Sequence, residues 1–513
     1  MDTAITAKFD ALQRKLPSLW KAIGQPDRPG GEHQQEQNTI VVIPSMTIDT
    51  DFKGSEQQAY EERSLFMLFL LRQPNIRIIY VTSQPIQASI IDYYLHILPG
   101  VVIGNARKRL FLVSPLDGSS RPLSLKLLER PRLIQHIRSL IPNLDLAHIV
   151  PYNTTELELE LAVRLGVPMY AADPHFFPLG TKSGGRRIFA EEGVPYPIGV
   201  EDLTGEDDLV EAIVGMRAHR PDLRRLMVKL NEGVSGEGNA VVDLQGLSKP
   251  RESGEREAVA ERVRAMRFEL SDATYAGFMA KMQERGGITE ELIAGDEFFS
   301  PSVQLRVSPL GEVQILSTHD QMLGGPGGQS YLGARFPANP AYSQLIVREA
   351  VKVGARLARE GVIGRFALDF VVVRSQDGEW EPYAIEINLR KGGTTHPFLT
   401  LQYLTDGTYD TAKGSFHTLL GHTKYYVATD HLENDDYRAF TPDDLFDIVS
   451  RYRLHFDHLA QKGIVMHMLS SISDRGRCGL TAIADTAEEA DALYKRTIQI
   501  FDDEARLALR AEV

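Results

Sequence analysis

Short, continuously apolar runs alternate with helical stripes through the first third of the chain. Residues 38–45 (NTIVVIPS) and 76–83 (IRIIYVTS) are β-branched and apolar at successive positions, which is typical of strands buried on both faces. Between them, residues 56–73 repeat apolar positions with the period of a helix. A further strand and helix follow, with Gly166 placed to end the helix. Residues 38–175 are therefore predicted to form a Rossmann-like α/β domain with a parallel sheet.

The hydrophobic pattern after residue 175 predicts further folded domains, so the chain is expected to be a multidomain protein of α/β and α+β class. A charged stretch, 249–270, favours a solvated helical insertion, and strand-rich patterns follow it. Apolar GIVMHMLSS and helical TAEEADALYKRTIQIF favour a small α+β unit at the end. Besides the α/β domain, the predicted divisions are an N-terminal helical segment at 1–37, two lobes at 176–286 and 287–425, and a C-terminal domain at 426–513.

Composition narrows the class of protein. At 43% hydrophobic and 24% charged residues the chain is typical of a globular protein, and it has no apolar run of the roughly 20 residues that a spanning helix needs. Its first residues lack the pattern of a signal peptide, and the single Cys478 cannot form an internal disulfide. A cytoplasmic protein without membrane attachment is expected. The net charge of −13 argues against a dedicated nucleic-acid binder, although a nucleotide site needs only a few basic residues.

Candidate chemistry begins in the stretch AIEINLR, where Glu386, Asn388 and Arg390 alternate with aliphatic residues. The preceding strand ends at Asp377-Gly378, a dipeptide that predicts a two-residue hairpin turn of type I′. That turn places Asp369 directly opposite Glu386, with Cβ atoms roughly 4.5–5.5 Å apart.

Two facing carboxylates repel each other unless a cation lies between them. Asn388 adds a neutral oxygen on the same face, and a ligand set made only of oxygen suits Mg²⁺. The hairpin is therefore predicted to be a magnesium site, with Arg390 as a fixed positive charge at its end. A surface hairpin with solvated acidic and basic residues is the alternative, and a different turn length would break the register.

A glycine-rich loop provides a second candidate. Lys229 ends an apolar strand, and Gly233, Gly236 and Gly238 follow before the next strand. Glycines let backbone N–H groups turn toward phosphate oxygens, and the lysine supplies a point charge for them. The loop lacks the GK[ST] sequence and the following helix of a P-loop, so an ordinary glycine-rich hairpin is an equal alternative.

These pieces, in this order over about residues 176–400, resemble the ATP-grasp superfamily, in which two α+β lobes close on ATP. The resemblance implies ATP and Mg²⁺ as cofactors. Phosphate contacts are implied for Lys182, Lys229, Gly233, Ser235, Gly236 and Gly238. Adenine contacts, mostly through the backbone, are implied for Glu290, Glu291 and Ile293, and a ribose contact for Glu297. Glu291 departs from the family, because many relatives have a lysine there.

For the reaction, the resemblance implies Mg²⁺ ligation by Asp369, Glu386 and Asn388, in agreement with the hairpin argument. Arg390 and Lys229 are implied to act on the transferred phosphate. The tail RKGGTTHP differs from the common NPRP ending and, with the domains on either side, is similar to the pheganomycin-type peptide ligases. An ATP-dependent ligase that joins a carboxylate to an amine through an acyl-phosphate is expected.

The expected partners are small amino-acid or peptide substrates, and the frequent dimers among superfamily relatives leave a homodimer open. Substrate contacts are expected from His319, Arg335, Gly392, Gly393, Thr394 and His396. An ATP-grasp kinase is one alternative function, distinguished by a phosphate that stays on its acceptor. A nucleotide-binding module without turnover is another, and the intact metal and phosphate residues argue against it. A dehydrogenase is less favoured, because no GxGxxG follows the first strand.

Overall fold

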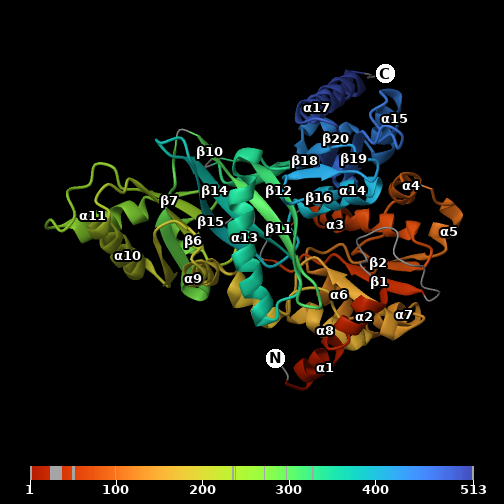
Figure 1. The fold of residues 1–513 in the computed structure, drawn as a ribbon, viewed down its shortest axis with the longest axis horizontal. Helices are drawn as coiled ribbons and strands as arrows, with labels where there is room; N and C mark the ends of the chain where they lie inside the picture. Colours follow the sequence, from red (N-terminus) through yellow and green to blue (C-terminus); the bar gives the residue numbers. More distant parts are fainter. Residues whose placement is uncertain are drawn as a thin grey trace.

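The computed structural model contains three large sheets (Figure 1). One lies at one end of the long axis, and the largest runs from the middle to the other end, where its last strands lie above the remaining sheet. It describes residues 3–23, 37–48, 52, 54–98, 100–233, 236, 238–270, 272–295, 297–325 and 328–510. Ser235, one of the predicted phosphate-binding residues, lies outside these ranges. Within the described residues, no helix is both long enough and apolar enough to cross a membrane.

The first sheet is parallel, as predicted, with strand order β3-β2-β1-β4. Its strands are β1 (Asn38–Ile43), β2 (Ile76–Val81), β3 (Leu110–Val113) and β4 (Ala147–Pro151). Val41 packs into the cluster on one face, whereas Ile40 and Val42 pack into the cluster on the other, so both faces are buried as the sequence indicated.

Helices cover both faces of the parallel sheet. Phe9 of the N-terminal helix is completely buried in one of these layers, which ties the first helical segment to the domain. The helical elements of this part are α1 (Thr3–Gln13), α2 (Leu16–Ile23), α3 (Glu56–Glu62), η1 (Arg63–Arg72), α4 (Ala88–His96), α5 (Ile103–Arg107), α6 (Leu123–Leu128), α7 (Pro131–Ser139), η2 (Leu144–Leu146), α8 (Glu156–Leu165) and η3 (Pro174–Gly180).

Two local features of this domain bear on the sequence predictions. Gly166 caps α8 in the left-handed region at φ 74°, so the predicted helix stop is confirmed. The helix predicted over residues 56–73 is instead an α-helix, α3, that continues as the 3₁₀ helix η1. Nearly all of η1 is buried, so side-chain packing on all sides replaces the one-sided contact that an amphipathic α-helix would make.

The second sheet is antiparallel, with strand order β5-β9-β6-β7-β8. Its elements are α9 (Lys182–Glu192), β5 (Gly199–Leu203), α10 (Glu206–His219), β6 (Arg225–Leu230), β7 (Asn239–Asp243), α11 (Glu255–Arg264), β8 (Arg267–Phe268), α12 (Tyr275–Arg285) and β9 (Gly287–Glu291). The charged stretch forms helix α11, as predicted. Val259 and Val263 nevertheless anchor it in the core of this lobe.

The third sheet has nine strands and runs through both the second predicted lobe and the C-terminal region. In order the strands are β10, β14, β11, β12, β13, β18, β20 and β19, and β15 also pairs with β14. The boundary predicted at 425/426 falls at the start of β18, where hydrogen bonds to β13 continue the sheet. The chain therefore crosses this boundary without leaving the sheet.

The elements of this region are β10 (Phe298–Phe299), β11 (Pro301–Val307), β12 (Val313–Gly324), β13 (Ser330–Phe336), α13 (Pro340–Glu360), β14 (Gly364–Arg374), β15 (Trp380–Asn388), α14 (Thr395–Thr405), β16 (Thr408–Asp410), β17 (Ser415–His417), β18 (Tyr425–Glu433), η4 (Asp435–Ala439), α15 (Pro442–Arg451), β19 (Gly463–His467), η5 (Leu469–Ser471), α16 (Ile472–Arg475), β20 (Arg477–Ala484) and α17 (Ala487–Arg510). Helix α13 packs along the nine-stranded sheet through residues such as Ile346 and Val353.

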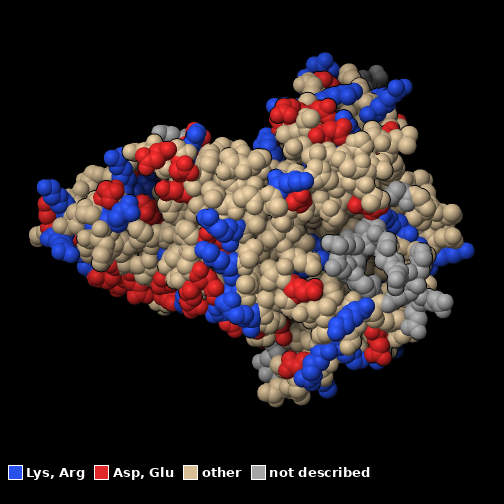
Figure 2. All heavy atoms as spheres, in the orientation of Figure 1, with Lys and Arg blue, Asp and Glu red and all other residues tan. Residues whose placement is uncertain are grey.

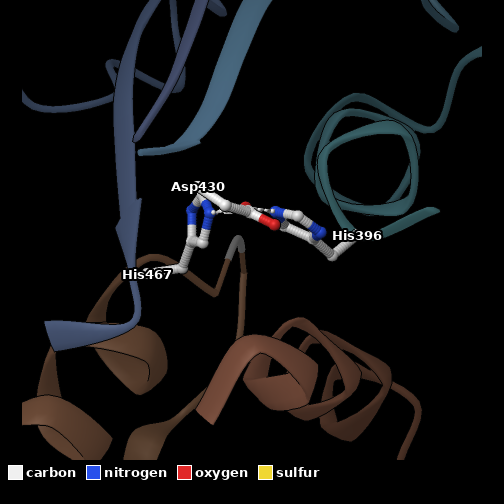
Figure 3. A group of neighbouring side chains, drawn as sticks. All are labelled: His396, Asp430 and His467. Carbon is white, nitrogen blue, oxygen red and sulfur yellow. Dashed lines mark hydrogen bonds and ion pairs between the residues drawn. The ribbon is translucent and has the colours of Figure 1, made fainter. Parts of the chain in front are cut away.

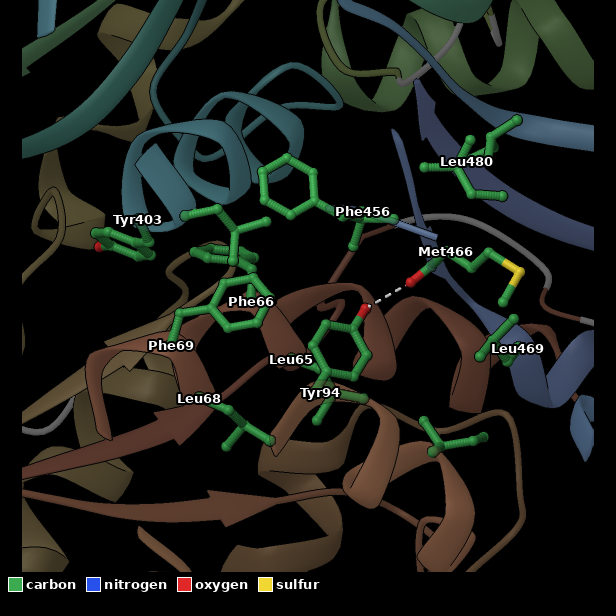
Figure 4. Packing of buried hydrophobic residues seen from close by; sticks show 14 of the residues in the cluster. Leu65, Phe66, Leu68, Phe69, Tyr94, Tyr403, Phe456, Met466, Leu469 and Leu480 are labelled. Carbon is green, nitrogen blue, oxygen red and sulfur yellow. Dashed lines mark hydrogen bonds between the residues drawn. The ribbon is translucent and has the colours of Figure 1, made fainter. Parts of the chain in front are cut away.

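The α/β domain and the C-terminal region share one hydrophobic core (Figure 4). Residues of η1, such as Leu65 and Phe69, belong to the same cluster as Met466 and Leu480. The hydroxyl of Tyr94 donates to the backbone carbonyl of Met466 at 3.0 Å, which satisfies a polar group within this core. The two parts therefore form one packed unit, although they are far apart in sequence.

A buried carboxyl in this shared unit predicts a pH-dependent stability. Ser470 donates from its backbone N–H to Glu62 at 3.0 Å, and burial raises the pKa of Glu62 from 4.5 to about 8. Because the folded pKa lies above the unfolded one, the stabilisation is complete below pH 4.5 and is lost as pH rises through 8. We expect Glu62→Gln to flatten this part of the profile in urea unfolding measured between pH 5 and 8. An unchanged slope in the variant would contradict the assignment.

On the face seen in Figure 2, basic and acidic side chains are interspersed, and acidic side chains gather along the lower edge beneath α10. This distribution agrees with the acidic net charge of −13.

Candidate functional site

The hairpin of β14 and β15 places the predicted carboxylates opposite each other. Asp369 pairs with Glu386, so the predicted register is confirmed at the site. The predicted two-residue turn is wrong, because Ser375 closes the loop against Glu379 and leaves three residues between them. Among the turn residues, Gly378 has a positive φ, of 86°.

The register is correct because a second irregularity offsets the longer turn. Phe370 pairs with Ala384 whereas Asp369 pairs with Glu386, which leaves Ile385 as an extra residue in β15. A bulge of this kind shifts the pairing by one residue. It returns the two carboxylates to the same position along the hairpin.

Two further side chains contact the facing carboxylates. The amide nitrogen of Asn388 donates to Asp369 Oδ2 at 3.0 Å, and Lys182 Nζ lies 2.5 Å from Glu386 Oε1. Lys182 is the first residue of α9, a helix capped by Thr181, whose hydroxyl accepts from the Gly184 N–H. The first residue of α9 therefore places a buried ammonium group beside the carboxylates of the hairpin.

The electrostatics of the pair fit a cation site. Burial and the neighbouring Glu386 raise the pKa of Asp369 to about 6. Burial also raises the pKa of Glu386, but Lys182 and Arg390 outweigh it and hold that pKa below its ordinary value. An additional cation at Asp369 would relieve the repulsion, and the oxygen donors of Asp369, Glu386 and Asn388 are those that Mg²⁺ prefers.

A cavity of about 460 Å³ lies over this hairpin, which is within the size range of ligand sites. It brings together residues of the α/β domain, of the five-stranded sheet and of the nine-stranded sheet. Of the residues predicted from sequence, the lining contains Lys182, Lys229, Gly233, Gly236, Asp369, Glu386, Asn388, Arg390, Gly392, Gly393 and Thr394. Gly238 lines an adjoining cavity of about 180 Å³.

The glycine-rich loop joins β6 to β7 beside the cavity. Gly236 and Gly238 have φ values of 84° and 82°, which other residues rarely adopt, so the loop needs glycine at both positions. Lys229 lies near the end of β6, and its Nζ donates to Glu290 Oε1 at 2.6 Å.

Glu290 positions Lys229, a role that the sequence did not predict. Its side chain is buried within the five-stranded sheet, and Arg186 Nη1 donates to its second oxygen at 2.9 Å. The buried carboxylate therefore fixes Lys229 from behind. A cluster of basic residues in one lobe, with glutamates on the adjoining strand β9, could have indicated the pair.

The other residues expected to contact adenine and ribose lie outside the cavity lining in this structure. Glu291 forms an ion pair with Arg220 at 3.3 Å, and Ile293 is half-buried beyond the end of β9. Glu297 is exposed and forms an ion pair with Arg374 at 2.9 Å. Their predicted roles stay predictions.

Two expected substrate residues are placed elsewhere. His319 is completely buried in β12, where its Nε2 lies 2.7 Å from the hydroxyl of Tyr426, and burial lowers its pKa to about 3. Arg335 forms an ion pair with Asp491 at 3.0 Å and does not line the cavity. Arg335 pairs with Asp320, the neighbour of the cavity-lining Gln321, and therefore lies on the other face of the sheet. His319 lies on the same face as Asp369, since both pair with Ser302, but its ring packs against Phe336 and Tyr426.

Residues 392–394 form the turn that leads from β15 into α14. A Cβ at Gly393 would lie 2.5 Å from the ring of Tyr331, so glycine allows the close approach. Thr394 is hydrogen-bonded to Gln304 of β11. The turn is therefore held against the sheet at the cavity wall.

His396 forms a buried group with Asp430 and His467 (Figure 3). His467 Nε2 lies 2.8 Å from Asp430 Oδ1, and His396 Nε2 lies 3.2 Å from the same oxygen. The residue types could hold a metal ion. However, Arg63 Nη1 lies 2.7 Å from the other carboxylate oxygen, and a fixed guanidinium opposes a second cation. We assign the two histidines as supports for Asp430, which itself lines the cavity.

The α/β domain and the C-terminal region supply a cavity wall that the sequence did not reveal. Its side chains are Glu56, Tyr60, Arg63, Tyr152, Asp430, His431, Arg475 and Arg477. The available signals were charged residues inside apolar segments, namely Arg63 before the run SLFMLFLL and Asp430 in the strand YYVATDHLE.

Two protein-family models match parts of this chain. The IQCH-like ATP-grasp family matches residues 177–269 and 253–412, and the PGM1 C-terminal domain family matches residues 444–497. An L-propargylglycine–L-glutamate ligase of Streptantibioticus cattleyicolor is 31% identical, over 85% of this chain and 88% of that protein. The IQ motif-containing protein H of Danio rerio is 23% identical over 97% of this chain, which spans 50% of that protein.

Solved structures share the fold. Biotin carboxylase from Campylobacter jejuni, solved as a complex with β,γ-ATP, has a TM-score of 0.54 at 13% identity and covers 92% of this chain and 95% of its own. An N5-carboxyaminoimidazole ribonucleotide synthetase solved with ADP has a TM-score of 0.51 at 14% identity, over 91% of this chain and 98% of its own. At these identities the likeness establishes the fold alone.

Proposed function

Because the chain belongs to the ATP-grasp superfamily and is an ATP-dependent ligase that forms carbon–nitrogen bonds, we propose that the cavity described above is its active site. The observation that carries this proposal is the pair Asp369 and Glu386, which faces one cavity together with Lys182, Lys229 and Arg390. Phosphoryl transfer requires mainly positioning and charge neutralisation, and this set provides both.

We propose the following roles for these residues. Lys182 and Lys229 hold the phosphates of ATP, and the loop around Gly236 covers them. Asp369, Glu386 and Asn388 hold Mg²⁺, which when bound neutralises phosphate oxygens and orients them. Arg390 lies at the end of β15 and steadies the charge on the transferred phosphoryl group.

The reaction follows from this arrangement. A substrate carboxylate attacks the γ-phosphorus of ATP, which gives an acyl-phosphate and ADP. An amine then attacks the acyl carbon, and the carbon–oxygen bond to phosphate breaks as the amide forms. The Gly-rich loop excludes water, which would otherwise hydrolyse the acyl-phosphate.

Amino acids are the proposed substrates. The relative from Streptantibioticus cattleyicolor is named for joining L-propargylglycine to L-glutamate. We therefore propose that this chain joins the carboxylate of one amino acid to the amine of another amino acid or of a peptide.

A product assay tests the proposal. The purified protein is incubated with ATP, Mg²⁺ and a pool of amino acids and short peptides that includes L-glutamate, while ADP and free phosphate are measured. Equal release of ADP and phosphate, with a product whose mass equals two components minus one water, supports a peptide ligase. ADP without free phosphate, and an acceptor that gains a phosphoryl group, would instead establish a kinase.

A further inference from the structure

Three arginines of the cavity wall form a group outside the proposed ATP and metal residues. Arg63 begins η1, Arg475 ends α16 and Arg477 begins β20, and all three line the cavity. We call them the guanidinium cluster. They come from the α/β domain and from the C-terminal region, the two parts that share one core.

Arg63 is buried and only partly satisfied. Its Nη1 donates to Asp430 at 2.7 Å, and its guanidinium lies over the rings of Tyr60 and Tyr152, at 4.9 and 5.1 Å. Its Nη2 is buried without a hydrogen-bond partner among the described residues. Since a buried guanidinium N–H is costly to leave unpaired, this nitrogen indicates an absent acceptor.

Arg477 has mainly neutral partners. It donates to the backbone carbonyl of Asp430 at 2.9 Å and to the hydroxyl of Tyr60 at 3.0 Å, and it lies 3.2 Å from His431 Nε2. Burial and Arg477 lower the pKa of His431 to about 4, so that ring is neutral at pH 7. Glu56 Oε1 lies 3.9 Å from Arg477 and 3.6 Å from Arg475, beyond hydrogen-bond distance.

The charges of this wall favour an anion. On this wall the three arginines of the cluster are opposed by the carboxylates Glu56 and Asp430, and over the whole lining six basic side chains are opposed by four carboxylates. Asp430 is already engaged by Arg63, His396 and His467. A carboxylate, which arginine can bind through two parallel hydrogen bonds, is the ligand that this geometry suits.

We propose that the guanidinium cluster binds a carboxylate carried by the amine substrate, so that the acceptor is an amino acid or a peptide with a free carboxylate. This inference rests on the proposed ligase function. It adds the group by which the second substrate is bound, a free carboxylate, and the residues that select it.

The position of the cluster decides which substrate it binds. Tyr152 separates it from Arg390: Arg390 Nη1 donates to the tyrosine hydroxyl at 3.4 Å, while Arg63 stacks on the ring. The activated carboxylate must reach the γ-phosphate beside Arg390 and the metal residues. A carboxylate held on the other side of Tyr152 stays unreacted, and in peptide-bond formation that carboxylate belongs to the amine substrate.

The bond-forming step is balanced without another reagent. The acceptor nitrogen forms a bond to the acyl carbon, the carbon–oxygen bond to phosphate breaks, and phosphate leaves with the electron pair. The departing phosphate takes the proton that the nitrogen loses. The acceptor carboxylate takes no part in these changes and serves for binding alone.

Matched acceptors test the inference. The twenty L-amino acids and their N-alanyl dipeptides are each offered as free acids and as C-terminal carboxamides, with ATP, Mg²⁺ and the amino-acid pool as carboxylate donor. We expect kcat/KM for the free acid to exceed that for its carboxamide at least about tenfold. Equal values overturn the inference while the ligase function stands. No product and no ADP from any pair would contradict the ligase function, and the inference with it.

Variants of the guanidinium cluster test whether its arginines cause the preference for the free acid over the carboxamide. Arg475→Gln changes the most exposed of the three arginines, and Arg477→Lys keeps the charge but removes the planar fork. Both should raise KM for the free acid at least about tenfold while changing KM for the carboxamide less than about twofold. Arg451→Gln, which alters an exposed ion pair of α15, is the matched control and should change neither value. Equal losses for acid and carboxamide would show a merely structural role.

Discussion

Replacing Asp369 by asparagine is expected to lower kcat for ADP formation by about 1,000-fold, which corresponds to about 4 kcal/mol of lost transition-state stabilisation. The variant removes one of the two carboxylates of the proposed magnesium site. It keeps the shape of the side chain and an oxygen that can accept from Asn388, whose amide donates to Asp369 at 3.0 Å. The rate of ADP release at saturating ATP and Mg²⁺ measures the effect.

The same hairpin offers the control. Asp377 lies in its exposed turn, so Asp377→Asn makes the same chemical change and should alter kcat less than about twofold. Because burial and Glu386 raise the pKa of Asp369 to about 6, removing its charge should not destabilise the fold. An Asp369→Asn enzyme with normal turnover, or one that fails to fold, would argue against a magnesium site at this hairpin.

Replacing Lys229 by methionine is expected to lower kcat/KM for ATP by about 100- to 1,000-fold, because a positive charge on the phosphates is lost. The variant also carries a folding cost. It leaves Glu290 buried with Arg186 as its remaining ion-pair partner among the described residues, and breaking a buried pair costs about 3–5 kcal/mol. Steady-state kinetics and urea unfolding measure the two effects separately.

A double variant separates the loss of activity from the loss of stability. Lys229→Met with Glu290→Gln removes both charges of the pair, so the stability lost in the single variant should largely return. The activity should not return, because the phosphate-binding ammonium is still missing. Recovery of activity together with stability would assign Lys229 a purely structural role.

Local sequence signals predicted the parallel sheet, the end of α8 at Gly166 and the pairing of Asp369 with Glu386. The last of these was correct through two differences that cancel: the loop has three residues between Ser375 and Glu379, and Ile385 forms a bulge. A dipeptide such as Asp-Gly favours several turn lengths, and nothing in an alternating strand marks where a bulge occurs.

The rest of the site depends on contacts between distant segments. Arg63 and Asp430 form an ion pair across 367 residues, and Lys182 reaches Glu386 from the start of helix α9. Periodicity within a short window carries no information about such pairs. His319 is the opposite case. The sequence led us to expect that it contacts substrate, but the strands around it bury it against Tyr426.

The core shared by the α/β domain and the C-terminal region has a consequence for synthesis on the ribosome. Tyr94 and Met466, which are hydrogen-bonded in that core, are 372 residues apart. The apolar side chains of η1 are made long before β19 and β20, the strands that cover them. The nascent chain therefore exposes this hydrophobic surface until those strands are made, which makes it a natural client for chaperones.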